Sequence, residues 1–343
     1  MPQINQLPLI FWWEYDAARV LGVLICCGLL PAVALHFLMK AFRKRTFLQI
    51  ENYAGRFVSL GLGFVWPLWG CGVVALTLAA SAWYKYWPRL GGSIFLSEHL
   101  LGYALAAGAV FAFGLIDDLG GGGASKGFKG HLKALAHGQV TTGVVKLFGI
   151  GITAIIFAFY VIEPAPLTGC LMTAFDRFHW VIFIFLVGGA VALSANFVNL
   201  CDLRPGRASK VSILLLVIGL VASVILRLVS ADSLTLSSLY LEFLWFLVFL
   251  LPMLVTLRYD LRERGMLGDA GANSSGFIAG AYIVMRLGLV GLAVYFAVML
   301  ALNLISEKVS YSQVIEKNPL LSRLDQIGRI KQGKQTGKKE STD

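Results

Sequence analysis

The stretch SGFIAGAYIVMRLGLVGLAVYFAVMLALNLI, residues 275–305, decides how many times this chain crosses a membrane. A single helix spans the apolar core of a bilayer with roughly 20 residues. The stretch is therefore too long for one span and short for two, and Arg286 lies near its middle, where a charge that faces lipid is costly. We expect a short helix that ends near Arg286, followed by a second helix over residues 287–305.

Seven further apolar runs can each cross a bilayer. They cover residues 18–42, 57–80, 100–116, 144–162, 180–195, 211–229 and 239–257. Of the 343 residues, 57% are hydrophobic and only 14% are charged, whereas soluble domains are about 25% charged. This composition excludes an ordinary soluble enzyme, a disordered chain and a disulfide-rich secreted module. The sequence predicts an all-α, polytopic integral membrane protein with about nine transmembrane helices, the eighth of them short.

The basic residues predict the orientation of these helices. With nine spans and an outer N-terminus, 23 of the 29 Lys and Arg residues fall on one side, in loops and in the C-terminal tail. Cytoplasmic loops of membrane proteins carry such an excess, so the tail is expected in the cytoplasm and the net charge of +10 requires no nucleic-acid partner. We expect a transmembrane domain over residues 1–305 and a cytoplasmic amphipathic segment with a disordered basic tail over residues 306–343. The first residues lack a basic region and a cleavage site, so no cleaved signal peptide is expected.

Acidic and amide side chains gather at the predicted cytoplasmic ends of three helices. They are Asp117 and Asp118 after the third span, Asn196, Asn199 and Asp202 after the fifth, and Asp269 after the seventh. The basic residues alone assigned the sides, so this convergence is a partly independent observation. Carboxylate and amide oxygens are the ligands that Mg²⁺ prefers. The pattern predicts a magnesium site at the cytoplasmic boundary of the membrane.

Basic side chains accompany these carboxylates in the same loops. The candidates for contact with a substrate are Lys129, Lys133, Arg204, Arg207 and Lys210. Carboxylates surrounded by lysines and arginines suit a metal–pyrophosphate complex, in which the basic groups neutralise the remaining phosphate charge. For all five a simpler interpretation stays open, in which they only mark the cytoplasmic side of the membrane.

Three of these motifs resemble those of the polyprenyl-phosphate N-acetylhexosamine-1-phosphate transferases, the family of phospho-N-acetylmuramoyl-pentapeptide transferase. GLIDDLGG at 114–121 resembles the family's Asp-Asp motif, and NFVNLCD at 196–202 resembles its Asn-x-x-Asn-x-x-Asp motif. GDAG at 268–271 is similar to its Gly-Asp-x-Gly motif, and ENYAG at 51–55 to a pattern in the first loop. The motifs occur in the family's order over most of the membrane region.

The resemblance implies an enzyme whose catalytic domain is the membrane domain, with its active site on the cytoplasmic face of the inner membrane. Such phosphotransferases move a sugar-1-phosphate from a nucleotide-diphosphate N-acetyl amino sugar to undecaprenyl phosphate or another polyprenyl phosphate, for cell-wall and peptidoglycan biogenesis. Mg²⁺ is their cofactor, and they are often homodimers.

Carried over by motif, the resemblance also implies roles for single residues. Asp117 and Asp118 would position the metal and phosphates or activate the acceptor, and Asn199 and Asp202 would lie near the reacting phosphates. Asp269 would be the principal metal ligand, with Asp118 and Asp202 beside it, while Asn196 would contact substrate.

Two features depart from the family's pattern. No histidine follows residue 305, where relatives often carry a His-rich motif, and Asp202 is followed by Leu-Arg-Pro-Gly-Arg instead of Gly-x-Asp-Gly. These departures keep a second hypothesis open, a non-catalytic relative that acts as a scaffold or regulator of envelope synthesis. A transporter is disfavoured, because its ionisable residues would lie near the bilayer midplane.

Overall fold

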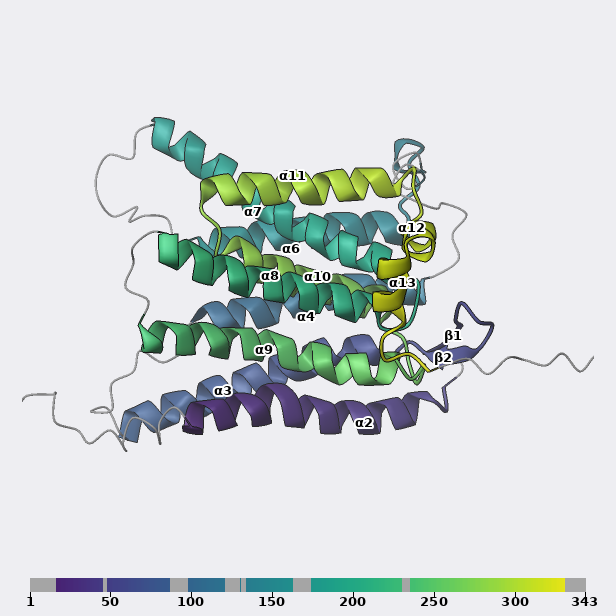
Figure 1. Ribbon diagram of the computed structural model, residues 1–343, viewed down its shortest axis with the longest axis horizontal. Helices are drawn as coiled ribbons and strands as arrows, with labels where there is room; N and C mark the ends of the chain where they lie inside the picture. The colour runs from purple at the N-terminus through teal and green to yellow at the C-terminus, as the bar shows by residue number, and fades with distance from the viewer. Residues whose placement is uncertain are drawn as a thin grey trace, which may run out of the picture.

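The computed structural model describes residues 17–45, 48–86, 98–120, 130, 134–162, 174–229 and 235–330. Long helices run along one common direction, and a short hairpin and two small helices lie together at one end (Figure 1). The elements are η2 (Leu24–Leu29), α2 (Leu30–Phe42), β1 (Gln49–Glu51), β2 (Phe57–Ser59), η4 (Leu62–Phe64), α3 (Val65–Tyr86), α4 (Glu98–Leu119), α6 (Thr142–Val161), α7 (Ala174–Cys201), α8 (Arg207–Val229), α9 (Leu236–Asp260), α10 (Gly268–Val284), α11 (Leu289–Ser306), α12 (Tyr311–Lys317) and α13 (Pro319–Gln326).

Eight helical segments of the described chain are long and apolar enough to cross a membrane. They are Ala17–Phe42, Leu62–Ala82, His99–Leu119, Thr142–Val161, His179–Cys201, Arg207–Val229, Leu236–Asp260 and Leu289–Ser306. The predicted all-α, polytopic membrane fold is therefore confirmed. The short helix α10 comes in addition to these eight.

Helix α10 is the centre of the bundle. It packs against α4, α7 and α8, and every residue from 270 to 284 is buried. Small residues allow this packing: a Cβ at Gly276 would lie 2.5 Å from the carbonyl oxygen of Ser194, and one at Gly280 would lie 2.6 Å from the Ser194 Cβ. Close backbone approach through small residues is typical of helix pairs in membranes.

The stretch 275–305 is divided as its length predicts. Helix α10 ends at Val284 and α11 begins at Leu289, with Arg286 between them. The Arg286 guanidinium forms an ion pair with Glu242 of α9 and lies 3.4 Å from the ring centroid of Tyr282. Tyr282 donates a hydrogen bond to the same Glu242 carboxylate at 3.1 Å. The charge of Arg286 is therefore balanced by a carboxylate within the protein, so the arginine does not face lipid without a partner.

The second span begins later than predicted. Residues 57–59 belong to the hairpin β1–β2, in which Ile50 pairs with Val58, and the helical span begins at Leu62 instead. The hairpin is closed by Asn52, whose Oδ1 accepts hydrogen bonds from the backbone N–H groups of Ala54 and Arg56 at 2.9 and 3.0 Å. A side chain that binds its own following backbone in this way favours a turn over a helix.

The fifth span is longer than expected at its C-terminal end. Helix α7 continues to Cys201, so Asn196 and Asn199 lie on the helix and not in a loop. An amide side chain on a membrane helix needs a polar partner. Asn196 has one, because its Nδ2 donates to Oδ1 of Asn303 in α11 at 2.6 Å.

Candidate functional site

Lys146 joins two of the predicted site carboxylates. Its Nζ lies 2.5 Å from Oδ2 of Asp117, at the end of α4, and 2.6 Å from Oδ2 of Asp269, at the start of α10. All three side chains are mostly buried, at 16%, 17% and 29% exposure for Lys146, Asp117 and Asp269. Three helices remote in sequence thus place opposite charges in one weakly hydrated network, where charge interactions are stronger than at an open surface.

Asp118 holds the first turn of α10. Its Oδ1 accepts the backbone N–H of Asp269 at 2.9 Å, and its Oδ2 accepts that of Ala270 at 3.0 Å. The first N–H groups of a helix lack partners within the helix, and the helix N-terminus favours a negative charge. A carboxylate from α4 therefore caps α10, although it was expected to be a metal ligand. This contact makes Asp118 a positioning residue for Asp269.

Steric contacts explain why the two positions flanking Asp269 and Ala270 in GDAG are glycines. Gly268 has a φ of +64°, and a Cβ there would lie 2.7 Å from Oδ2 of Asp118. Gly271 lies against Gly63, whose Cα would be 2.9 Å from an added Cβ. Glycine adopts the positive φ of residue 268 without strain, and at residue 271 it leaves room for the backbone of Gly63. The motif is thus required by the packing of α10 against α4 and η4.

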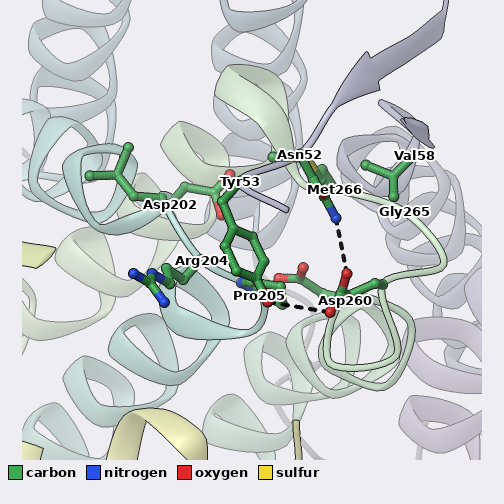
Figure 2. A pocket seen from close by; sticks show the side chains of 11 residues that line it. Asn52, Tyr53, Val58, Asp202, Arg204, Pro205, Asp260, Gly265 and Met266 are labelled. Atoms are coloured by element: carbon green, nitrogen blue, oxygen red, sulfur yellow. Dashed lines mark hydrogen bonds between the residues drawn. The ribbon is translucent and has the colours of Figure 1, made fainter. Parts of the chain in front are cut away.

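The loop after α7 brings Asp202 to the same end of the bundle. Burial, together with the charges of Asp260, Asp269 and Asp118, raises the pKa of Asp202 well above its usual value. The loop turns at Gly206, which has a φ of +75° and whose N–H donates to Asp260 at 2.8 Å. Figure 2 shows Asp202 and Arg204 of this loop around one small pocket with Tyr53 of the hairpin.

The predicted anion-binding residues Arg204, Arg207 and Lys210 bind the C-terminal segment. Nε and Nη2 of Arg207 donate to the two carboxylate oxygens of Asp325 at 3.0 and 3.1 Å. Arg204 forms an ion pair with Glu316, and Lys210 donates to the carbonyl oxygen of Asp325 at 2.7 Å. The structure thus gives these side chains other partners than the expected substrate anions, because the segment after α11 supplies its own carboxylates.

An apolar cavity of about 380 Å³ opens beside Lys146. Helices α6, α7, α10 and α11 line it, and its polar residues include Asn196, Asn199 and Asn273. Asn273 is buried, and its Oδ1 has no hydrogen-bond partner among the described residues. A mostly apolar cavity with a few polar groups at one end is typical of a site for an amphipathic ligand.

The predicted residues therefore fall into four groups, one of which is the basic set that contacts the C-terminal segment, Arg204, Arg207 and Lys210. Asp117 and Asp269 share Lys146, and Asp118 accepts the backbone N–H of Asp269. The charges of Asp118 and Asp269 also act on Asp202. Asn196 and Asn199 line the adjacent cavity. Lys129 and Lys133 lie outside the described residues.

Sequence reasoning missed Lys146 as a site residue and counted it only as a cytoplasmic charge. A signal was present, because the lysine interrupts the apolar run GVVKLFGIG at 143–151. Ionisable residues within membrane segments are rare and are paired with one another. Asp260 and Asn273 were missed as well, since neither belongs to one of the recognised motifs.

The donor set agrees with Mg²⁺ in chemistry. Asp117, Asp202 and Asp269 offer hard carboxylate oxygens, and Asn273 offers an amide oxygen without a partner. Within the described ranges, however, no three acidic, histidine or cysteine side chains are gathered around one point. Lys146 lies between Asp117 and Asp269 and supplies the positive charge there.

No protein-family model matches this chain, and no curated protein is significantly similar to it. The fold and the apolar helices define its class, an all-α, multi-pass membrane protein. Its acidic network lies at the end of the bundle that also carries the hairpin and helices α12 and α13 (Figure 1).

Proposed function

We propose that this chain is a Mg²⁺-dependent phosphotransferase of the inner membrane. It would move a sugar-1-phosphate from a nucleotide-diphosphate N-acetyl amino sugar to a polyprenyl phosphate, for envelope glycan synthesis. The observation that carries the proposal is the network Asp117–Lys146–Asp269, which lies beside an apolar cavity lined by α7 and α11 among other helices.

The cavity and the network suit the two parts of the acceptor. An isoprenoid chain is apolar and matches the lining of the cavity, where Leu193, Leu200 and Leu300 lie. The phosphate of the lipid is anionic and would be bound by Lys146 and by the amides of Asn196 and Asn199. An amphipathic substrate would thus lie with its reactive end at the acidic network.

The reaction needs positioning and charge neutralisation more than covalent help. An oxygen of the lipid phosphate attacks the β-phosphorus of the donor, a new phosphoanhydride bond forms, and the nucleoside monophosphate leaves. When bound, Mg²⁺ would neutralise the pyrophosphate charge, and Asp269 and Asp117 would hold it, since Mg²⁺ commonly takes only one or two carboxylates from the protein when a substrate phosphate is present. Lys146 would balance charge on the acceptor side, while Asp118 keeps Asp269 in place.

The proposed orientation places this end of the bundle in the cytoplasm, where nucleotide sugars are present. It rests on the excess of Lys and Arg in the loops at this end, since cytoplasmic loops carry such an excess.

The alternative is a non-catalytic scaffold of envelope synthesis. It is favoured by one observation, the engagement of Arg204, Arg207 and Lys210 by the C-terminal segment instead of by an open site. A scaffold would bind partners through this end and would release no nucleotide.

Turnover by the purified full chain tests the proposal. Undecaprenyl phosphate, Mg²⁺ and a panel of nucleotide-diphosphate N-acetyl sugars would be supplied in detergent, and both nucleoside monophosphate and the lipid product would be measured. We expect equal amounts of both products with at least one donor, and loss of both in Lys146→Met. Arg323→Gln is the matched control, because it removes an exposed charge from the same end. A folded chain that turns over no donor would favour the scaffold.

A further inference from the structure

A second cavity lies on another side of the bundle, between the N-terminal helix and α9. Its volume is about 540 Å³, and apolar side chains such as Leu24, Leu29 and Leu254 line it. These three are 41%, 57% and 44% exposed in the isolated chain, so in a bilayer they face acyl chains. None of the residues that line this cavity belongs to the acidic network or to its adjacent cavity.

The backbone is irregular where the cavity forms. The N-terminal helix has π-helical hydrogen bonding over η2, and Leu24, Gly28 and Leu29 of this segment line the cavity. Such wide turns within a longer helix are rare and frequently mark functional sites. Towards the other end of the cavity, a hydrogen bond of 3.1 Å joins His36 Nδ1 and the Tyr259 hydroxyl, which links the two helices.

Three arginines mark the end of the cavity at the membrane boundary. Arg258, Arg262 and Arg264 all line it and all are exposed. In the part of the chain that the structure describes, none of the three forms an ion pair. Lys40 of α2 and Lys44 just after it line a separate hollow.

We propose that this cavity binds an anionic phospholipid of the surrounding leaflet, with one acyl chain in the apolar part and the phosphate on the three arginines. Basic pockets between transmembrane helices bind anionic headgroups in this manner. The guanidinium group suits the phosphate, because its donors match two phosphate oxygens at once. The inference is independent of the proposed transferase activity.

A second copy of the chain is the less suitable occupant of this face. In a symmetric dimer each surface patch meets the same patch of the partner. The arginines of the two copies would then approach one another without an acidic residue among those that line the cavity. A lipid phosphate provides the charge that this face lacks.

Lipid titration of the purified full chain, followed by native mass spectrometry, tests the proposal. We expect dioleoyl-phosphatidylglycerol to bind at least about tenfold more tightly than dioleoyl-phosphatidylcholine, since each basic residue near an anionic lipid contributes several-fold in affinity. Equal affinity for the two lipids would overturn the proposal without the need for any variant.

Charge variants locate the site. The triple variant Arg258→Gln, Arg262→Gln, Arg264→Gln should lose the preference for phosphatidylglycerol. A control triple, Lys308→Gln, Lys317→Gln, Arg323→Gln, removes three exposed charges away from the cavity and should keep it. Equal losses in both triples would show general attraction to the basic surface and would overturn the site.

A further pair of measurements separates a lipid from a headgroup alone and from a second copy. Ala32→Trp narrows the apolar part of the cavity and should weaken phosphatidylglycerol binding, whereas soluble glycerol phosphate should not displace the lipid. If glycerol phosphate displaces phosphatidylglycerol and Ala32→Trp binds that lipid as tightly as the unmodified chain, the proposal that an acyl chain fills the cavity is overturned. Masses of a dimer that excludes lipid would show that another copy covers this face and would also reject the proposal.

Discussion

Asp118 accepts the backbone N–H of Asp269 at 2.9 Å, so one carboxylate of the recognised motifs fixes the position of another. The two residues lie on different helices, α4 and α10, and are 151 positions apart in the chain. The two residues of the Asp-Asp motif thus have different contacts: Asp117 pairs with Lys146, and Asp118 caps α10.

Asp118→Asn should lower stability. An amide has one acceptor oxygen where the carboxylate has two, so one N–H of α10 would face an NH₂ group and lose its partner. We expect a loss of about 1–3 kcal/mol in the free energy of unfolding, measured by thermal or denaturant unfolding in detergent. An unchanged stability would contradict the capping assignment.

Asp269→Asn should abolish activity while the protein stays folded. The substitution keeps the shape of the side chain and removes a charge that pairs with Lys146 and that is proposed to bind metal. We expect turnover to fall at least ~10²-fold, equivalent to about 2.7 kcal/mol of transition-state stabilisation. Near-normal turnover by folded Asp269→Asn would reject the metal assignment.

Arg207→Lys should loosen the C-terminal segment. A lysine cannot donate from two nitrogens to both oxygens of Asp325, and Arg207 also donates to Ser312 at 2.8 Å. Charged hydrogen bonds contribute ~1.5–3 kcal/mol, so we expect α12 and α13 to be cleaved faster in limited proteolysis. Asp325→Asn should have the same effect, and the double variant should add little. Additive effects of the two substitutions would contradict a direct pair.

If substrate binds Arg207 only after this segment is displaced, the same substitution also lowers kcat/KM, by roughly 5- to 30-fold for a loss of 1–2 kcal/mol. An unchanged kcat/KM would assign the arginine to docking of the segment alone.

Docking of the C-terminal segment should depend on pH. Burial raises the pKa of Asp325, but the hydrogen bonds from Arg207 and the charges of Arg207 and Arg329 outweigh it and hold the pKa below its usual value. The stabilisation is therefore fully present above the unfolded pKa of about 3.9 and is lost as the pH falls through the lower folded value. Proteolysis of α13 should increase only below about pH 4, and Asp325→Asn should remove this dependence.

A reporter fused after residue 334 should report a cytoplasmic location. The division of residues 275–305 into α10 and α11 returns the chain to the end of the bundle that carries the acidic network. A reporter signal from the opposite side would reject the proposed orientation of all the helices.

Length and hydropathy were sufficient to predict the helices, because bilayer thickness constrains both. The same reasoning ended the fifth span too early. The hydropathy pattern places Asn196 and Asn199 in a loop, whereas a partner on α11 and the adjacent cavity allow these amides on the helix. Periodicity within one helix does not show what a neighbouring helix offers.

The site could be predicted only in part. Motifs identified Asp117, Asp118 and Asp269, but not which of them pairs with Lys146 and which binds backbone. The sequence did not identify the partner of Arg207, for a different reason. Asp325 lies 118 positions away, in a segment that the sequence described only as amphipathic.

The burial of α10 has a consequence for the biogenesis of the protein. Residues 270–284 are all buried, and Arg286 forms an ion pair with Glu242 of α9. The translocon therefore cannot release α10 into lipid as an independent helix, and its insertion has to be completed together with α9 and against α4 and α7. The acidic network needs Asp269 of α10, so it would form only after the earlier helices around α10 are in place.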